Sequence, residues 1–420
     1  MSKAEKVRAI QTEVKHLILK VYIGAWGGII LGGISRSTVR DVHFVYVDAN
    51  AFRGWYPGDQ SDEINQTNQT MVFGSPIIGI EAFDDLVAFA HKTYSIRLRV
   101  NAILVEKERR IFQDLVETLH KKGYGSRLII NPTNLLSLAN QQIAVINGDS
   151  TALVDKLVRF TSSRKKYSFY FLDPFGASGI PLRGYVDKII SLPRHDVIIN
   201  FPYLDLHRKT GLTQRPELSV EMEQRLQNCD RMFGHNHWRT LATDMDDEAD
   251  HRKSLQLEQE LVDLYRDALK GVDPELAVKS IRMRFPERER TMYYLFLTTH
   301  DPTGALTMNQ LLWDAKLAEN ELRWQLREKK EVAPEQLRLF NIPVPPPPDQ
   351  PEARPSKEVI ADHISELLRG RRMVLREVYL ALADEQYFTR EVDSAIRFLR
   401  RKKKAHFLGN LVNTTEIVFH

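Results

Sequence analysis

The sequence predicts an α/β protein with a mostly parallel sheet, followed by a small basic domain. Short, nearly continuous apolar runs rich in β-branched residues alternate with helical patterns, as in sheets that helices cover on both faces. Seven of the 19 prolines lie within residues 341–355 and divide the chain. Of the 420 residues, 43% are hydrophobic and 27% are charged, which is sufficient for one large and one small core.

Five apolar runs are predicted as parallel strands, at residues 43–47, 100–105, 142–146, 168–172 and 197–201. Helices are expected between them, at 82–93, 109–122, 150–159 and 182–192. Residues 278–285 and 291–299 predict two further strands joined by a short turn, and hence an antiparallel pair. Such a sheet is typical of Rossmann-like S-adenosylmethionine methyltransferases. We therefore predict this fold for residues 1–340, with a charged helical insertion at about 207–275.

The proline-rich residues 341–355 predict an extended linker. Beyond it, helices at 357–368, 375–383 and 389–403 and a hairpin at 405–420 predict a winged-helix-like domain over residues 356–420. The third helix has a buried face of Val392, Ala395, Ile396 and Leu399, at helical spacing. Its outward residues are Arg390, Ser394, Arg397 and Arg401.

A basic cluster on this domain predicts contact with nucleic acid, through Arg390, Arg397, Arg401, Lys402 and Lys403. Contacts of this kind with phosphates give sequence-independent affinity that falls with salt. Two alternatives remain open. The cations can simply complement the dipole of a solvated helix end, or the domain can dock a partner protein.

Charge and cysteine content limit the compartment and the chemistry. The net charge of +4 permits nucleic-acid binding without requiring it. Cys229 is the single cysteine, so neither an intramolecular disulfide nor a cysteine zinc cluster can form. A cytoplasmic protein is the simplest interpretation. The apolar residues 21–34 are too short for a membrane span and contain several glycines, so we expect a buried helix end and loop.

Acidic residues follow four of the predicted strands, where open α/β sheets bind their ligands. Glu106, after the second strand, suits a ribose diol, because carboxylate oxygens accept from two hydroxyl donors. Asp149 can accept from an adenine amino group or can cap the next helix. Together with Asp48 and Gly54 after the first strand, these residues form the predicted cofactor site.

The segment Asp173-Pro174-Phe175-Gly176 resembles the motif by which amino-group methyltransferases hold an exocyclic amine. In that motif the carboxylate and a backbone carbonyl accept the amine hydrogens, and the aromatic ring stacks on the base. Asp173, Pro174 and Phe175 are therefore the predicted catalytic residues. The alternative is a strand-to-loop turn with Phe175 in the core.

Motifs in matching order over about residues 10–330 resemble those of the three-Cys-motif partner protein family. They are Tyr46-Val47-Asp48, Gly74-Ser75-Pro76-Ile77-Ile78, Val105-Glu106-Lys107, Asn147-Gly148-Asp149, Asp173-Pro174-Phe175-Gly176 with Ser178-Gly179-Ile180-Pro181, Ile199-Asn200-Phe201, and residues 293–299. The resemblance implies a methyltransferase-like fold, S-adenosylmethionine as cofactor, and a partner with a three-cysteine motif like that of radical S-adenosylmethionine enzymes. It also implies a role in DNA modification or defence. The Asp173 segment is similar to that of tRNA guanosine N2-dimethyltransferases, which implies a guanine or adenine amino group in DNA or RNA.

The loop after the first strand departs from the family pattern. The family has Asp-Gly-Phe-Ala-Gly-Pro-Gly, whereas this chain has Asp48-Ala49-Asn50-Ala51-Phe52-Arg53-Gly54. Phe52 replaces the central glycine and adds bulk where a ligand is expected. Three functions stay open: a nucleobase amino-methyltransferase, a non-catalytic nucleic-acid-binding or scaffold subunit with a degenerate cofactor site, and a domain that binds an adenine nucleotide as a regulatory ligand.

Two other groups of residues have ordinary interpretations. His235 and His237, near three aspartates, have the residue types of a metal site, but nothing in the sequence fixes their geometry, so a solvated loop is preferred and we expect no metal. Trp313 and Trp324 are expected to pack within the protein.

Overall fold

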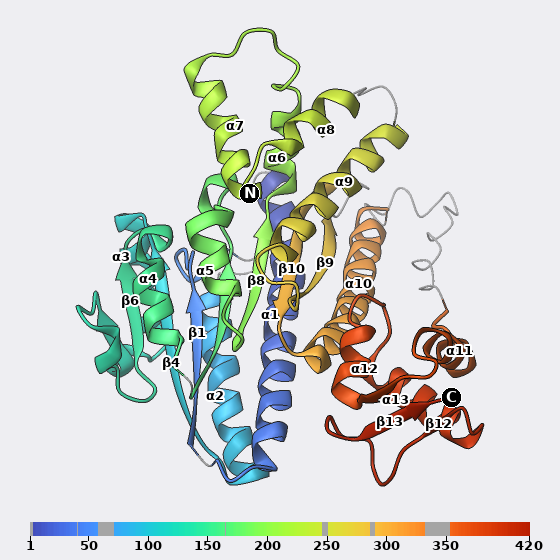
Figure 1. Ribbon diagram of the computed structural model, residues 1–420. Helices are drawn as coiled ribbons and strands as arrows, with labels where there is room; N and C mark the ends of the chain where they lie inside the picture. Colours follow the sequence, from blue (N-terminus) through green and yellow to red (C-terminus); the bar gives the residue numbers. More distant parts are fainter. Residues whose placement is uncertain are drawn as a thin grey trace, which may run out of the picture. The chain divides into compact units, whose positions relative to one another are not determined.

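The computed structural model describes residues 3–39, 41–57, 71–163, 165–245, 251–285, 290–331 and 353–420. Its contacts divide the chain into two units, Met1–His300 and Asp301–His420 (Figure 1). The division falls before the long helix α10 (Pro302–Glu331), ahead of the proline-rich segment. Of the predicted linker, only residues 353–355 lie within the described part.

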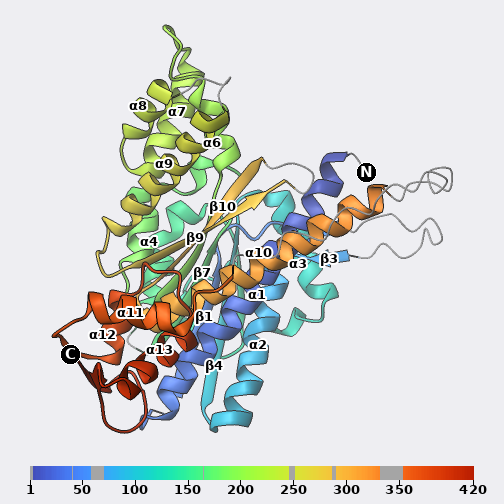
Figure 2. The ribbon, with the colours of Figure 1, turned by 90° about the vertical axis from the view of Figure 1, so that its right-hand side faces the viewer.

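The first unit is built on an eight-stranded sheet with helices on both faces (Figures 1 and 2). Its strands, in spatial order, are β5 (Leu128–Ile130), β6 (Ile143–Asn147), β4 (Arg97–Glu106), β1 (Asp41–Asp48), β7 (Lys166–Leu172), β8 (His195–Phe201), β10 (Thr291–Thr299) and β9 (Ala277–Arg284). The strands from β5 to β8 are parallel, and β10 is antiparallel to both of its neighbours. The Rossmann-like α/β class is confirmed, as are the five parallel strands and the antiparallel pair. β5 was not predicted.

The central strands are buried because both of their faces are covered. Seven of the eight residues of β1 are buried, and Phe44, Val45, Tyr46 and Val47 have no exposed surface. This burial explains the near-continuous apolar sequence of each strand. The order of connections reverses between β1 and β7, which makes the carboxyl ends of these two strands a topological switch point.

The N-terminal helix α1 (Lys3–Ser35) corrects one prediction. The apolar residues 21–34 continue the helix instead of ending it in a loop. Gly27 allows close packing of this helix on α2 (Ser75–Tyr94), because a Cβ there would lie 2.5 Å from the side chain of Leu86. Residues 14–35 are long and apolar enough to cross a membrane, but 44% of that window is buried inside the protein, so the indication of a span is weak.

The remaining helices of this unit are α3 (Arg109–Lys121), α4 (Ser150–Thr161), α5 (Asp187–Ile190), α6 (Tyr203–Thr210), α7 (Val220–Phe233), α8 (His237–Met245) and α9 (His251–Lys270). The last four lie between β8 and β9, where a helical insertion was predicted. A short hairpin of β2 (Trp55–Pro57) and β3 (Met71–Phe73) follows the β1 loop.

The second unit contains α10, α11 (Lys357–Leu367), β11 (Arg372–Val374), α12 (Leu375–Ala381), α13 (Thr389–Arg401), β12 (Ala405–His406) and β13 (Glu416–Phe419). Its strands form an antiparallel sheet in the order β11-β13-β12. The four predicted inward residues of α13 are all buried, and Leu306 of α10 joins their core.

Candidate functional site

A cavity of about 260 Å³ lies at the carboxyl ends of four parallel strands. The loops after β1, β4, β6 and β7 meet there, as expected at a topological switch point. The lining residues are Ala49, Asn50, Glu106, Lys107, Gly148, Asp149, Ser150, Thr151, Pro174, Phe175, Gly176, Ser178 and Gly179. The fold thus brings Glu106 and Asp149 of the predicted cofactor site together with Pro174 and Phe175 of the predicted amine site.

Glu106 fixes the β1 loop while lining the cavity. Its Oε2 accepts from the backbone N–H of Phe52 at 2.9 Å, and its Oε1 accepts from that of Glu108 at 2.8 Å. A carboxylate offers about four acceptor positions. Glu106 therefore retains acceptor capacity for hydroxyl groups of a ligand.

Asn50 is a site residue that the sequence reasoning missed. Its backbone N–H donates to Asp48 at 3.3 Å, but its side-chain Oδ1 is buried and has no hydrogen-bond partner within the described structure. A buried acceptor without a partner costs free energy unless a ligand or water supplies a donor. The signal in the sequence that could have identified Asn50 is its position two residues after Asp48, at the carboxyl end of β1.

Asp149 caps the helix α4, the structural alternative that the sequence allows for it. As N-cap of α4 it accepts from Thr151 N at 2.9 Å, and its other oxygen pairs with Lys107 Nζ at 2.8 Å. It nevertheless lines the cavity, together with Lys107, whose ammonium compensates its charge.

Asp48 and Gly54 do not line the cavity. Asp48 is fully buried and accepts from the hydroxyl of Tyr46 at 3.1 Å. Burial, with a smaller contribution from the charge of Asp173, raises the pKa of Asp48 to about 7. Gly54 has a φ of +76°, and its carbonyl accepts from Gly74 N at 2.8 Å, so it shapes the turn into the β2 hairpin.

Asp173 is engaged on both carboxylate oxygens. Lys15 Nζ of α1 lies 2.5 Å from Oδ2, and Asn200 Nδ2 of β8 donates to Oδ1, also at 2.5 Å. The Lys15 and Asp173 side chains are only 10% and 15% exposed. Although burial opposes the charge of Lys15, the carboxylate of Asp173 raises the pKa of Lys15, so this side chain remains an ammonium.

Lys15 was also missed, because 158 residues separate it from Asp173 and no local pattern identifies it. Asn200, in the motif Ile199-Asn200-Phe201, is not predicted as a site residue by the sequence. Its Oδ1 is buried without a partner in the described residues. Since a carboxylate cannot donate, the amide nitrogen must face Asp173, which leaves Oδ1 as an acceptor without a donor.

The backbone of the Asp173 segment depends on its glycines. A Cβ on Gly179 would lie 2.4 Å from Cβ of Pro174, and Gly176 has a φ of +146°. Phe175 is 87% exposed at the edge of the cavity, so the core placement considered for it is wrong. The ring is available to a ligand.

Phe52 keeps the backbone conformation of a glycine. Its φ is +50°, in the left-handed region that glycine adopts most readily. The ring packs edge-on against Phe175, with centroids 5.5 Å apart, and does not line the cavity. The bulk expected inside the ligand site therefore lies at its rim.

The predicted nucleic-acid residues of the second unit are all exposed on or just beyond α13. Arg397 has one weak ion pair, with Asp393 at 3.9 Å. Arg401 and Lys402 lie 6.0 and 5.6 Å from the ring of Phe398. Their charges remain available to phosphates.

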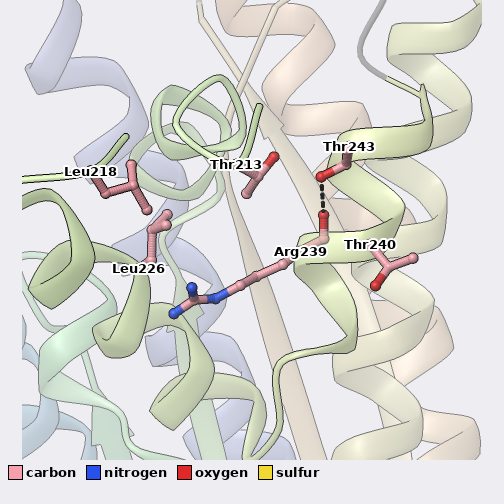
Figure 3. Close-up of a pocket in the computed structure, with 6 residues that line it drawn as sticks. All are labelled: Thr213, Leu218, Leu226, Arg239, Thr240 and Thr243. Atoms are coloured by element: carbon pink, nitrogen blue, oxygen red, sulfur yellow. Dashed lines mark hydrogen bonds between the residues drawn. The ribbon is translucent and has the colours of Figure 1, made fainter. Parts of the chain in front are cut away.

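A second cavity, of about 270 Å³, lies in the helical insertion (Figure 3). Its one charged lining residue, Arg239, is already paired with Asp230 at 2.6 Å and Glu223 at 3.0 Å. The rings of His235 and His237 are 5.0 Å apart. Within the described chain no group of three His, Cys, Asp or Glu residues has metal-binding geometry.

No protein-family model and no curated protein match this chain. Among solved structures, a Legionella pneumophila strain Philadelphia 1 protein of the family DUF519 is similar over 69% of this chain and 85% of its own. The TM-score is 0.34 and the sequence identity is 10%. This likeness carries no argument about function.

Proposed function

We propose that the first unit is an S-adenosylmethionine-dependent methyltransferase that acts on an exocyclic amino group of a nucleobase in DNA or RNA. The observation that carries the proposal is the cavity where the β1, β4 and β6 loops meet the Asp173 segment. A cofactor pocket and an amine-holding motif then share one wall, formed by Pro174, Phe175 and Gly176.

The polar groups around the cavity suit such a cofactor. Glu106 would accept from the ribose hydroxyls and Asp149 from the adenine amino group. The orphaned Oδ1 of Asn50 would accept from the cofactor's α-ammonium. The volume is slightly below the roughly 300–1,000 Å³ typical of ligand pockets, so part of the cofactor would extend beyond the cavity mouth. When bound, the cofactor supplies an electrophilic methyl group.

The amine side would work by alignment. Asp173, the Pro174 carbonyl and the orphaned Oδ1 of Asn200 are acceptors for the two N–H groups of an exocyclic amine. Phe175 would stack on the base. The amine competes with Lys15 for Oδ2 of Asp173, so productive binding requires Lys15 to move or the amine to use the remaining acceptor positions.

One observation favours the alternative of a non-catalytic nucleic-acid-binding or scaffold subunit. The ion pair of Lys15 with Asp173 satisfies the carboxylate that an amine needs. In this second function the exposed basic residues of a winged-helix-like C-terminal domain would hold DNA or RNA for a three-Cys-motif partner in the cytoplasm. The order of helices and strands in the second unit supports that domain type.

Calorimetric titration of S-adenosylmethionine and S-adenosylhomocysteine tests the proposal. We expect both ligands to bind. Asn50→Ala should lower the affinity for S-adenosylmethionine about tenfold, because one hydrogen bond to a charged group is lost. Asn50→Ala keeps the backbone contact to Asp48. Asn236→Ala, at an exposed asparagine of the insertion, is the matched control and should leave affinity unchanged. If neither ligand binds, even with nucleic acid present, the methyltransferase proposal fails and the scaffold remains.

A further inference from the structure

We infer that the β1 loop adds a second stacking surface beside Phe175, and that this surface selects unpaired nucleotides. We call Phe52, Tyr56 and Phe175, with Arg53, the aromatic platform. The inference names the class of nucleic acid that binds at this site, which is a single strand or a locally unpaired base. It rests on the proposed function only in assuming that a nucleic-acid substrate binds here.

The rings of the aromatic platform form a continuous group at the cavity rim. Phe52 lies 5.5 Å from Phe175 at an interplanar angle of 62°, and 6.0 Å from Tyr56 at 23°. Phe52 and Tyr56 are half-buried, whereas Phe175 is largely exposed. Single exposed apolar residues are common on protein surfaces, but here one largely exposed ring is continuous with two half-buried rings beside a polar cavity, and such a group can form a binding surface.

Arg53 gives the aromatic platform a positive charge. Its guanidinium lies 4.8 Å from the centroid of Phe52 and 5.8 Å from that of Trp55. Its Nε is buried and has no hydrogen-bond partner among the described residues. Arg53 as a whole is only half-buried, so its outer guanidinium nitrogens are the donors that suit a phosphate oxygen of a strand whose base lies on the neighbouring ring.

The backbone of Phe52 has a strained conformation that places its ring in the aromatic platform. A φ of +50° costs a non-glycine residue about 1 kcal/mol or more, and Glu106 holds the residue there by accepting its N–H. Strain of this kind concentrates at functional sites. Here it places the ring at the rim next to Phe175.

The chemistry of stacking identifies the ligand. A side-chain ring can stack on a base only where the face of that base is free, and in a duplex both faces are covered by neighbouring base pairs. Stacking tolerates any base sequence, whereas Arg53 responds to the phosphate that DNA and RNA share. The aromatic platform therefore favours single-stranded over double-stranded nucleic acid of either type.

Fluorescence anisotropy of the full chain with labelled single-stranded DNA, single-stranded RNA and duplex DNA tests the inference. We expect Phe52→Gly and Phe175→Ala each to weaken single-strand binding about 5- to 10-fold, and to change duplex binding by less than about twofold. Arg53→Met should lower the affinity for single strands. It should also reduce the slope of log affinity against log salt concentration by about one, as expected for one lost phosphate contact. Phe89→Ala, at a ring 40% exposed on α2, is the control and should have no effect.

Equal losses on single strands and duplexes, or no loss for both ring variants, would overturn the inference. A difference between the DNA and RNA arms identifies the natural strand. The result is independent of the cofactor titration. If the protein binds single strands but not S-adenosylmethionine, the methyltransferase proposal fails and the aromatic platform stands. If it binds S-adenosylmethionine but the ring variants leave strand binding unchanged, the aromatic platform fails and the methyltransferase proposal stands.

Discussion

The two sides of the site differ in how far the protein satisfies its own polar groups. At the ends of β1 and β4, Asn50 Oδ1 has no partner in the described chain, and each oxygen of Glu106 accepts a single hydrogen bond from the described residues. At the end of β7, Asp173 is paired with a buried ammonium and an amide. A ligand can enter the first side without breaking contacts, whereas an amine at Asp173 must compete with Lys15. The first side, proposed to hold the cofactor, is therefore open, and the second side, proposed to hold the amine, is closed.

Replacing Lys15 is the strongest test of that closed side. Lys15→Met leaves the buried carboxylate of Asp173 without its cation, so we expect the free energy of unfolding to fall by about 3–5 kcal/mol at pH 7. Urea denaturation followed by circular dichroism measures the change. Adding Asp173→Asn to Lys15→Met should recover most of the loss, because the uncompensated charge is then removed.

The control for this prediction is on the same helix. Lys20 of α1 is exposed, and Lys20→Met should change stability by less than about 0.5 kcal/mol. If Lys15→Met were equally silent, Asp173 would be solvated in solution, and the two sides of the site would not differ as described.

The same contrast separates what the sequence can predict from what it cannot. Continuous apolar runs identify the five central strands, and parallel topology then places Glu106, Asp149 and Asp173 at one edge. Lys15 escapes such reasoning because its contact spans 158 residues and depends on how α1 crosses the sheet. β5 is only three residues long, too short for a periodic signal.

Asp48, buried at the carboxyl end of β1, gives a smaller, pH-dependent effect. Burial raises its folded-state pKa from 3.8 to about 7. The folded protein therefore holds this proton more tightly than the unfolded chain, and the resulting stability, complete below the unfolded pKa, is lost as pH rises through 7. Relative to wild type, the free energy of unfolding of Asp48→Asn should rise by about 2.5 kcal/mol between pH 5 and pH 8. Urea denaturation of both proteins at several pH values checks this, and a constant difference would show that Asp48 is ionised throughout.

The smallest effect concerns Phe52, where the open side meets the aromatic platform. Phe52→Gly and Phe52→Ala both remove the ring, but only glycine suits a φ of +50°. We therefore expect Phe52→Gly to be more stable than Phe52→Ala by about 1 kcal/mol in urea denaturation, although glycine has the more flexible unfolded chain. Ala51→Gly is the control, because a glycine at this position should lower the free energy of unfolding. Ala51 is buried and has no positive φ, so the added flexibility and the lost methyl group should destabilise the protein. If Phe52→Gly were the less stable of the pair, the left-handed turn would not persist in solution, and Phe52 would lie closer to the cofactor side, where it would obstruct the cavity.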